Sequence, residues 1–541
     1  MRCARISART GSWRNRSYRF SAVAPIIPGP LGFPPESTSG WVLLALAFLA
    51  AWEVVRYVVF RAIRRRVERR VLRLLHSKRI RLDRYKLANK SYVKAEILAD
   101  PPIHQAVEER ATADDVPVEV VRRDVEDWVD EIVPAFSFVT YYELGKRIAR
   151  WALSLVYEVA VDRASQVRMA DALEGGAVPI FVMNHRSNAD YIVATHVLMK
   201  QTAISYAVGE WARVWPLDSL FRSFGAYFVR RGFRDPLYHL VLRRYVQLAA
   251  KRGVTQGIFP EGRLTRDGLL GPAKVGLLDA FVELCLDPEL ERDFLLVPVG
   301  LNFDRVLEDT TLLGEARRGA APGGIFSRLR SLGSLLVRGP ITLVQNGLRL
   351  LFGRTRRHGH AAVAFGEPIS LRSLFEKEHV DIHAMSPEDR KAWLKSLGAR
   401  VMAAIGRVIP ATPVPLVAEA VRRLGMGTIA RDRLRAGVAT VLDDVRRSGA
   451  PVVLGRIGAR VKGARRKLER DKDARSAETK DLEDAFLDDE EAEAVLAAGL
   501  DILRRRRVLR LAHDQVTVRR AEVVAYYAAS IAQHLRRAVV A

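Results

Sequence analysis

A histidine and an aspartate five residues apart form the most informative pair in the chain. His185 and Asp190 lie in PIFVMNHRSNADYIV, residues 179–193. The apolar run before His185 predicts a strand that ends in a turn, and a helical pattern begins near Ser187, so the carboxylate can return against the imidazole. Such a histidine takes a proton from a substrate hydroxyl, while the aspartate fixes its tautomer and stabilises the imidazolium. Taken alone, this spacing is weak evidence and favours a merely structural pair.

Arginines follow two further apolar runs. GAYFVRR ends in Arg230 and Arg231, and GIFPEGRLTRDG, residues 257–268, contains Arg263 and Arg266. Both groups would lie at the carboxyl ends of strands, where α/β sheets usually gather their ligands. The planar guanidinium suits a phosphate because it binds two phosphate oxygens at once. One such arginine is usually a solvated surface charge, but four of them at two strand ends indicate a phosphate site.

Short apolar runs separated by helical stretches supply the strands that would position these residues. They are residues 178–183, 203–208, 226–229, 255–259, 294–299 and 361–365. Strands that alternate with helices predict an α/β core, here a mixed sheet flanked by helices. We assign this core to residues 171–375. A helical domain, 81–170, precedes it, and a mostly helical C-terminal domain, 376–541, with a highly charged stretch at 466–493, follows it.

The first 80 residues combine a tail with a candidate membrane segment. Residues 1–39 are rich in Arg, Ser and Pro and are typical of a disordered basic tail, and residues 40–80 contain the uncharged run Trp41–Trp52 followed by a basic helix. A span needs about 20 apolar residues, so a single span and an interfacial anchor both stay open. The arginines after Phe60 would place the rest of the chain in the cytoplasm, on the inner face of the cell's cytoplasmic membrane. Residues 325–352 predict two amphipathic helices, either on a membrane or packed on the core.

The composition indicates anionic partners and argues against several classes of protein. The 541 residues carry a formal charge of +25, and 49% of them are hydrophobic, enough for a buried core. Charge alone does not choose among phosphorylated substrates, anionic membrane lipid and nucleic acid. The two cysteines form no CxxC, and HExxH, P-loop and GxSxG motifs are absent from the sequence, so zinc hydrolases, NTPases and serine hydrolases have no support.

The motifs together resemble a known family. NHRSNADY, GAYFVRR, FPEG with Arg266, and LVPVGLNFDRVLED (residues 296–309) occur in the order of the four sequence blocks of glycerolipid acyltransferases. The HRS-x-x-DY form, Lys274 in PAKVG and FDRVLE resemble the glycerol-3-phosphate and dihydroxyacetone-phosphate acyltransferases more than the lysophosphatidate enzymes. Segments such as AFGEPISL and TPVPLVAEA extend the similarity to the bacterial membrane glycerol-3-phosphate acyltransferases over residues 84–540.

The resemblance implies a role for each block. His185 would be the general base and Asp190 its partner. The other residues would bind the substrates: Arg230 or Arg231 the acceptor phosphate, Glu261 and Gly262 the acceptor site, Arg266 the phosphate, and Pro298 the acyl donor. Lys274 would be a further substrate-binding residue. The third block departs from the family's EGGRSR, because this chain reads EGRLTR. Leu264 stands where an arginine is expected and Arg263 stands beside it, which leaves open which arginine holds the phosphate.

The implied activity is transfer of a fatty acyl group from acyl-CoA or acyl-carrier-protein to the 1-hydroxyl of sn-glycerol 3-phosphate, forming lysophosphatidate. Neither a metal nor a bound cofactor is required. Dihydroxyacetone phosphate or a lysophospholipid stays open as the acceptor. The alternative from another class is a basic nucleic-acid-binding protein, based on the charge and on a predicted basic hairpin at 502–520. It leaves the four ordered blocks unexplained, so we expect no nucleic acid partner.

Overall fold

The computed structural model describes most of the chain from residue 90 onward. The described residues are 90–134, 136, 146–199, 202–209, 217–230, 233–285, 287, 290, 292–317, 358–382, 384–459, 463 and 477–535, together with 57, 58 and 61. The chain divides into two units, residues 1–67 and residues 68–541. Within the described part, no helix has both the length and the apolar character needed to cross a membrane. The predicted tail, almost all of the predicted anchor at 40–80 and the predicted helices at 325–352 lie outside the described residues, so the predicted N-terminal membrane segment has no support in the structure.

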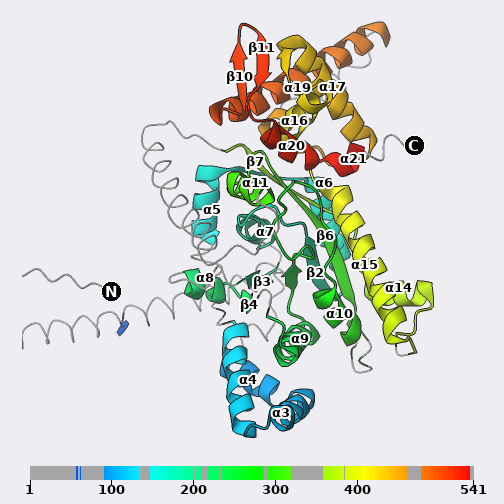
Figure 1. Cartoon of the computed structure of the whole chain (residues 1–541). Helices are drawn as coiled ribbons and strands as arrows, with labels where there is room; N and C mark the ends of the chain where they lie inside the picture. The colour runs from blue at the N-terminus through cyan, green and yellow to red at the C-terminus, as the bar shows by residue number, and fades with distance from the viewer. Residues whose placement is uncertain are drawn as a thin grey trace, which may run out of the picture. The chain divides into compact units, whose positions relative to one another are not determined.

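A mixed eight-stranded sheet forms the core, as predicted (Figure 1). Its order is β1-β7-β6-β2-β5-β3-β4, with β8 paired to β6; β7 and β8 run antiparallel to β6, and the other pairs are parallel. The strands are β1 (Glu158–Val161), β2 (Val178–Met183), β3 (Ser205–Gly209), β4 (Tyr227–Val229), β5 (Gln256–Ile258), β6 (Phe294–Phe303), β7 (His360–Phe365) and β8 (Ile369–Ser370).

Both faces of the sheet are covered, which explains why its strands are apolar throughout. All six residues of β2 are buried. Alternate side chains point to opposite faces, so Ile180 and Val182 join one hydrophobic cluster, whereas Phe181 and Met183 join the other. Helices α9 (Pro236–Lys251), α10 (Gly276–Leu284) and α15 (Pro387–Val408) contribute to the first cluster, and α7 (Asp190–Leu198) contributes to the second.

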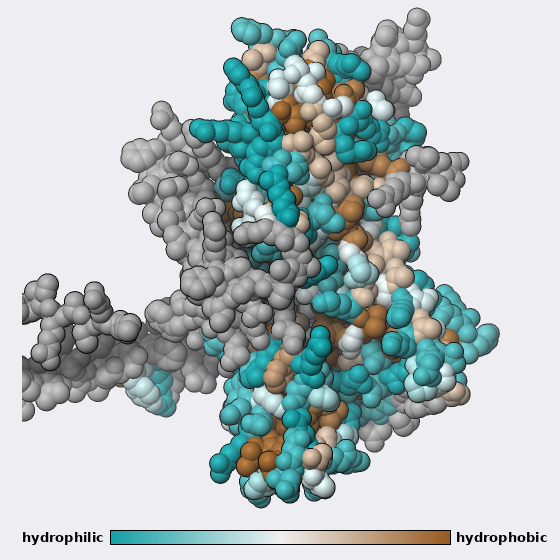
Figure 2. Space-filling view, viewed as in Figure 1, coloured by the Kyte–Doolittle hydropathy of each residue, from teal (hydrophilic) through white to brown (hydrophobic). Residues whose placement is uncertain are grey.

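Helices from outside the core join these two faces. On the N-terminal side, α2 (Lys90–Leu98), α3 (Pro101–Asp114) and α4 (Val118–Ile132) pack against α9 and belong to the α9 cluster. The buried residues of α4 include Trp128, whose ring meets Tyr238 of α9 edge-on, with ring centroids 5.7 Å apart. Figure 2 shows that the drawn face is largely hydrophilic, with small apolar patches.

The C-terminal part joins the face that carries α7. Helices α16 (Pro413–Arg423), α17 (Arg431–Arg447), α19 (Ala477–Arg505) and α20 (Ala521–Ala529) all belong to that cluster, and α21 (Ala532–Leu535) follows them. A small antiparallel sheet, β10-β11-β9, accompanies them, with β9 at Thr428–Ala430, β10 at Leu509–Ala512 and β11 at Gln515–Val518. The predicted basic hairpin is β10 and β11.

One part of the secondary-structure prediction is wrong. The predicted helical domain, residues 81–170, also contains a strand, because Glu158–Val161 form β1 at the edge of the core sheet. This strand has only four half-buried residues and pairs with β7, about two hundred residues later. Its strand conformation depends on that distant partner rather than on a local pattern. Helices α5 (Lys146–Val156), α6 (Arg163–Ala172) and α8 (Leu217–Ser223) complete this half of the core.

Candidate active site

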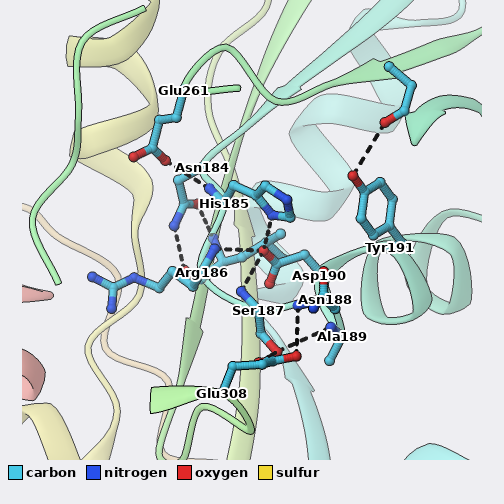
Figure 3. A network of polar contacts seen from close by, with 12 residues as sticks. Asn184, His185, Arg186, Ser187, Asn188, Ala189, Asp190, Tyr191, Glu261 and Glu308 are labelled. Carbon is cyan, nitrogen blue, oxygen red and sulfur yellow. Dashed lines mark hydrogen bonds and ion pairs between the residues drawn. The ribbon is translucent and has the colours of Figure 1, made fainter. Parts of the chain in front are cut away.

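Asn184, the residue between β2 and His185, fixes the start of the turn that carries the histidine. The side-chain amide of Asn184 donates to the carbonyl of Leu301 at 2.9 Å, and its oxygen accepts from the N–H of Leu301 at 2.8 Å. This reciprocal pair ties the end of β2 to the neighbouring strand β6. The chain then leaves the sheet at a defined point, and His185 is the next residue (Figure 3).

His185 and Asp190 lie side by side at the start of α7. His185 Nδ1 is 2.9 Å from Asp190 Oδ2, and the two side chains are 1% and 0% exposed. The same carboxylate oxygen accepts from the backbone N–H groups of Arg186 at 2.7 Å and Ser187 at 3.0 Å. Because a carboxylate can only accept, the shared proton belongs on Nδ1, and Nε2 keeps a lone pair. Nε2 is buried and has no hydrogen-bond partner among the described residues, which leaves it available as a base.

Two aromatic rings hold the imidazole. The Phe259 ring lies 4.3 Å from it, centroid to centroid, at 32°, and Tyr191 meets it edge-on at 5.5 Å. The Tyr191 hydroxyl donates to the carbonyl of Ala207 at 3.3 Å, which anchors this ring on β3. The imidazole is therefore confined to one plane while its free nitrogen stays unobstructed by hydrogen bonds.

Glu261 joins the histidine turn to the loop that follows β5. Its two carboxylate oxygens accept from the N–H of His185 at 2.8 Å and from the N–H of Gly271 at 3.0 Å. Burial raises the pKa of Glu261, and the two N–H donors oppose that rise. The sequence analysis predicts Glu261 at the acceptor site. In the structure its buried carboxylate links the backbone of His185 to the backbone of Gly271, and Glu261 does not line the pocket described next.

A cavity of about 550 Å³ opens in front of His185. Its apolar wall includes Leu242 of α9, Ile258 of β5 and Leu277 of α10. Its basic side chains are Arg230, His239, Arg243, Arg263 and Lys274. Such a pocket, with an apolar wall and a few convergent polar groups, has the character of a ligand site.

Two of these cations are already paired. Arg230 forms a forked ion pair with the buried Glu131 of α4, the shortest contact being 2.6 Å, and Arg243 pairs with Asp279 at 3.0 Å and Glu283 at 2.9 Å. Arg263 and Lys274 are exposed, and among the described residues neither has a carboxylate partner. These two side chains therefore carry the uncompensated positive charge of the pocket.

The loop after β5 brings Arg263 and Lys274 together. Gly262 has φ +66°, a left-handed conformation that suits glycine, and the N–H of Lys274 closes the loop on the carbonyl of Pro260 at 2.7 Å. A Cβ added to Gly262 would lie 2.8 Å from Lys274 Cδ, so the lysine side chain passes directly over this glycine.

Two other predicted residues, Arg266 and Pro298, lie away from the cavity lining. Arg266 lies further along the loop and pairs with Glu315 of α11 (Asp309–Arg317) at 3.3 Å. Pro298 is buried in β6 opposite Val182 and packs beneath Gly366. Arg231 lies outside the described residues.

Sequence reasoning did not assign several residues that complete the site. Glu131 holds Arg230 from a helix about one hundred residues earlier, and Glu308 contacts the histidine turn from the segment after β6. No local motif marks Glu131. Glu308 stands within FDRVLED, a segment used above only for the family resemblance.

Comparison with known proteins supports the family resemblance. Residues 164–302 match the Acyltransferase family model, and residues 348–481 match the model of the glycerol-3-phosphate acyltransferase C-terminal region. The glycerol-3-phosphate acyltransferase of Aeromonas hydrophila is 29% identical over 361 residues, which cover 65% of this chain and 42% of that protein. The chain is similar to the glycerol-3-phosphate acyltransferases.

Other relatives give the same picture. The glycerol-3-phosphate acyltransferase of Shewanella frigidimarina is 28% identical over 363 residues, covering 64% of this chain and 42% of that protein. The chain thus spans about two fifths of the length of the curated acyltransferases it matches. Among solved structures, the 1-acyl-sn-glycerophosphate acyltransferase of Thermotoga maritima matches with 16% identity and a TM-score of 0.26, covering 48% of this chain and 76% of that one. That similarity is too distant to define equivalent residues.

Proposed function

We propose that the chain transfers a fatty acyl group from a thioester donor, acyl-CoA or acyl-carrier-protein, to the 1-hydroxyl of sn-glycerol 3-phosphate. One observation carries the proposal: His185, whose Nε2 has no hydrogen-bond partner among the described residues, lines a cavity together with Arg263 and Lys274, which have no carboxylate partner there. A base beside a phosphate-binding pair selects a small phosphorylated alcohol as the acceptor. The acyltransferase relatives support the same reaction.

The reaction needs no nucleophile from the protein. His185 Nε2 takes the proton of the acceptor hydroxyl, and the oxygen attacks the thioester carbonyl to form a tetrahedral intermediate. This intermediate collapses by breaking its C–S bond, and the imidazolium returns the proton to the leaving thiolate. Asp190 stabilises the imidazolium during this step, since its carboxylate is 2.9 Å from Nδ1. The products are the 1-acyl ester of glycerol 3-phosphate and the free thiol.

The cavity offers a place for each end of the substrates. Arg263 and Lys274 would bind the phosphate of the acceptor, because a phosphate dianion needs cations that no carboxylate neutralises. The apolar wall on α9, α10 and β5 would take the first part of the acyl chain. Arg230 is held by Glu131, so it would shape the cavity rather than offer a free charge.

We also propose that the protein works on the cytoplasmic face of the bacterial inner membrane. The net charge of +25 favours an anionic lipid surface, and a product with one acyl chain partitions into lipid. Separation of cell membranes from cytosol, followed by protease treatment of spheroplasts, tests this assignment. Recovery of the full chain in the cytosol would refute it.

The activity is tested by incubating the purified chain with radiolabelled palmitoyl-CoA or palmitoyl-acyl-carrier-protein. Glycerol 3-phosphate, dihydroxyacetone phosphate and a lysophospholipid serve as parallel acceptors, and His185→Ala serves as the control. We expect labelled lysophosphatidate from glycerol 3-phosphate, and almost none with the variant. Equal or faster acylation of another acceptor would refute the proposed acceptor, and product formation by His185→Ala would refute the mechanism.

A further inference from the structure

Glu308 contacts the histidine turn from the side opposite Glu261 (Figure 3). Its carboxylate accepts from the hydroxyl of Ser187 at 2.8 Å and from the N–H of Asn188 at 3.3 Å. Burial raises the pKa of Glu308, and the two donors from the turn oppose the rise. The mechanism proposed above makes no use of this carboxylate, and it lies outside the cavity lining.

One residue that Glu308 holds, Ser187, also helps to fix Asp190. Ser187 is fully buried, and its N–H donates to Asp190 Oδ2 at 3.0 Å. Its carbonyl accepts from the N–H of Asp190 at 3.0 Å, and its hydroxyl oxygen accepts from the N–H of Ala189 at 3.1 Å. Any displacement of Ser187 therefore moves the carboxylate that orients His185.

Glu308 is itself fixed by the elements around it. Its carbonyl accepts from the N–H groups of Thr311 and Leu312, both at 2.9 Å, so Glu308 is held at the position just before helix α11. The next residue, Asp309, accepts from the hydroxyl of Tyr527 at 2.6 Å and pairs with Arg506 at 2.5 Å. Tyr527 also accepts from the N–H of Val306 at 3.0 Å. The C-terminal helices thus hold the short segment that delivers Glu308 to the turn.

We propose that Glu308 is a positioning residue for the acyl transfer: by holding Ser187 and Asn188 it keeps Asp190 and His185 in the reactive arrangement. This inference rests on the proposed function. The carboxylate accepts from both groups, whereas a glutamine keeps one acceptor oxygen and turns an N–H₂ group toward the other partner. The Asn188 N–H can only donate, so the glutamine oxygen would have to face it, and the Ser187 hydroxyl would lose its acceptor and have to redirect its proton. Loss of the contact between Glu308 and the turn would leave the cavity and its cations in place. It would allow the imidazole of His185 to move away from its reactive position.

The test compares Glu308→Gln with the wild-type chain and with Glu378→Gln. Glu378 pairs with Arg400 and Trp393 at the surface, far along the chain from the histidine turn, and so controls for the loss of one hydrogen-bonded carboxylate charge. Misplacement of a catalytic group by a fraction of an ångström to one ångström costs up to about 100-fold, so we expect kcat to fall about 10- to 100-fold. The KM values for both substrates should change less than about threefold, since substrate binding is untouched.

Ser187→Ala supplies an independent variant that removes only the hydroxyl. If Glu308 acts through Ser187, the double variant should be about as slow as the slower single variant, because contacting residues are not additive. A merely structural glutamate would lower the unfolding temperature and leave kcat per folded molecule unchanged. Independent, multiplicative losses of kcat in the double variant would also overturn the proposal.

A readout without acyl transfer separates this inference from the proposed function. Diethyl pyrocarbonate modification of His185, followed by peptide mass mapping, reports how firmly the imidazole is held. We expect Glu308→Gln to speed it by about fivefold or more, because a local opening exposes a buried group, with the exposed His513 as internal reference. If the wild type transfers no acyl group but this acceleration occurs, the proposed function fails and the positioning role stands. Unchanged modification with unchanged kcat overturns the positioning role.

Discussion

Removal of Arg263 tests which residues bind the acceptor phosphate. Arg263 lines the cavity in front of His185 and has no carboxylate partner among the described residues, whereas Arg266 pairs with Glu315 outside the lining. A charge-assisted hydrogen bond contributes about 1.5–3 kcal/mol, which corresponds to about 10- to 150-fold in affinity. Because Arg263 is exposed, we take the lower part of this range and expect Arg263→Ala to raise the acceptor KM about 10- to 30-fold.

The assay measures kcat and KM for glycerol 3-phosphate at a saturating concentration of acyl donor, and then KM for the donor. Arg266→Ala should shift the acceptor KM less than about threefold, since its loss removes a surface ion pair. Arg168→Ala, an exposed arginine on α6, controls for the loss of one positive charge. A larger KM effect for Arg266→Ala than for Arg263→Ala would refute the assignment from the structure and favour the role implied by the family's pattern.

Four further variants test the rest of the site and its frame. His185→Ala and Asp190→Asn should each lower kcat by about 10²–10⁴ with the fold intact, as measured by transfer assays and circular dichroism. Gly268→Ala should destabilise the loop after β5, because φ is +84° and the new Cβ would lie 2.1 Å from a carbonyl oxygen of α20; a melting temperature equal to that of the wild type would contradict this. Burial opposes the charge of His360, but the hydrogen bond and charge of Asp304 outweigh burial and raise its pKa. The stability that the imidazolium adds is therefore complete below the unfolded pKa of about 6.5 and is lost as pH rises through the raised pKa. Thermal unfolding of the wild type and His360→Asn at several pH values should show a difference that shrinks over this window.

The predictable parts of the fold are those that depend on residues close together in the sequence. Strand β2 is a run of six apolar residues with a buried side chain at every position, and its limits agree with the prediction. His185 and Asp190 are five residues apart, so one turn decides their geometry. Strand β1 was missed because its four residues are half-buried and become a strand only beside β7. Glu131 and Glu308 were not assigned for the same reason, since their partners lie 99 and 121 residues away.

In the third sequence block, the family pattern does not indicate which side chain lines the cavity. The expected order puts Arg266 on the phosphate, but the path of the loop decides which side chain enters the cavity. The tight turn at Gly262 and the closing hydrogen bond from Lys274 to Pro260 bring the two ends of the loop together beside His185. Arg266 lies in the middle of that loop, where Glu315 is within reach, and Leu264 packs against the hydrophobic cluster that carries α7. A lysine twelve residues after the turn can then stand in the cavity, where the linear motif predicts an arginine. The cations that line the cavity, and that we propose bind the acceptor, are brought there by the closure of the loop, a contact between its ends that a residue-by-residue sequence comparison does not show.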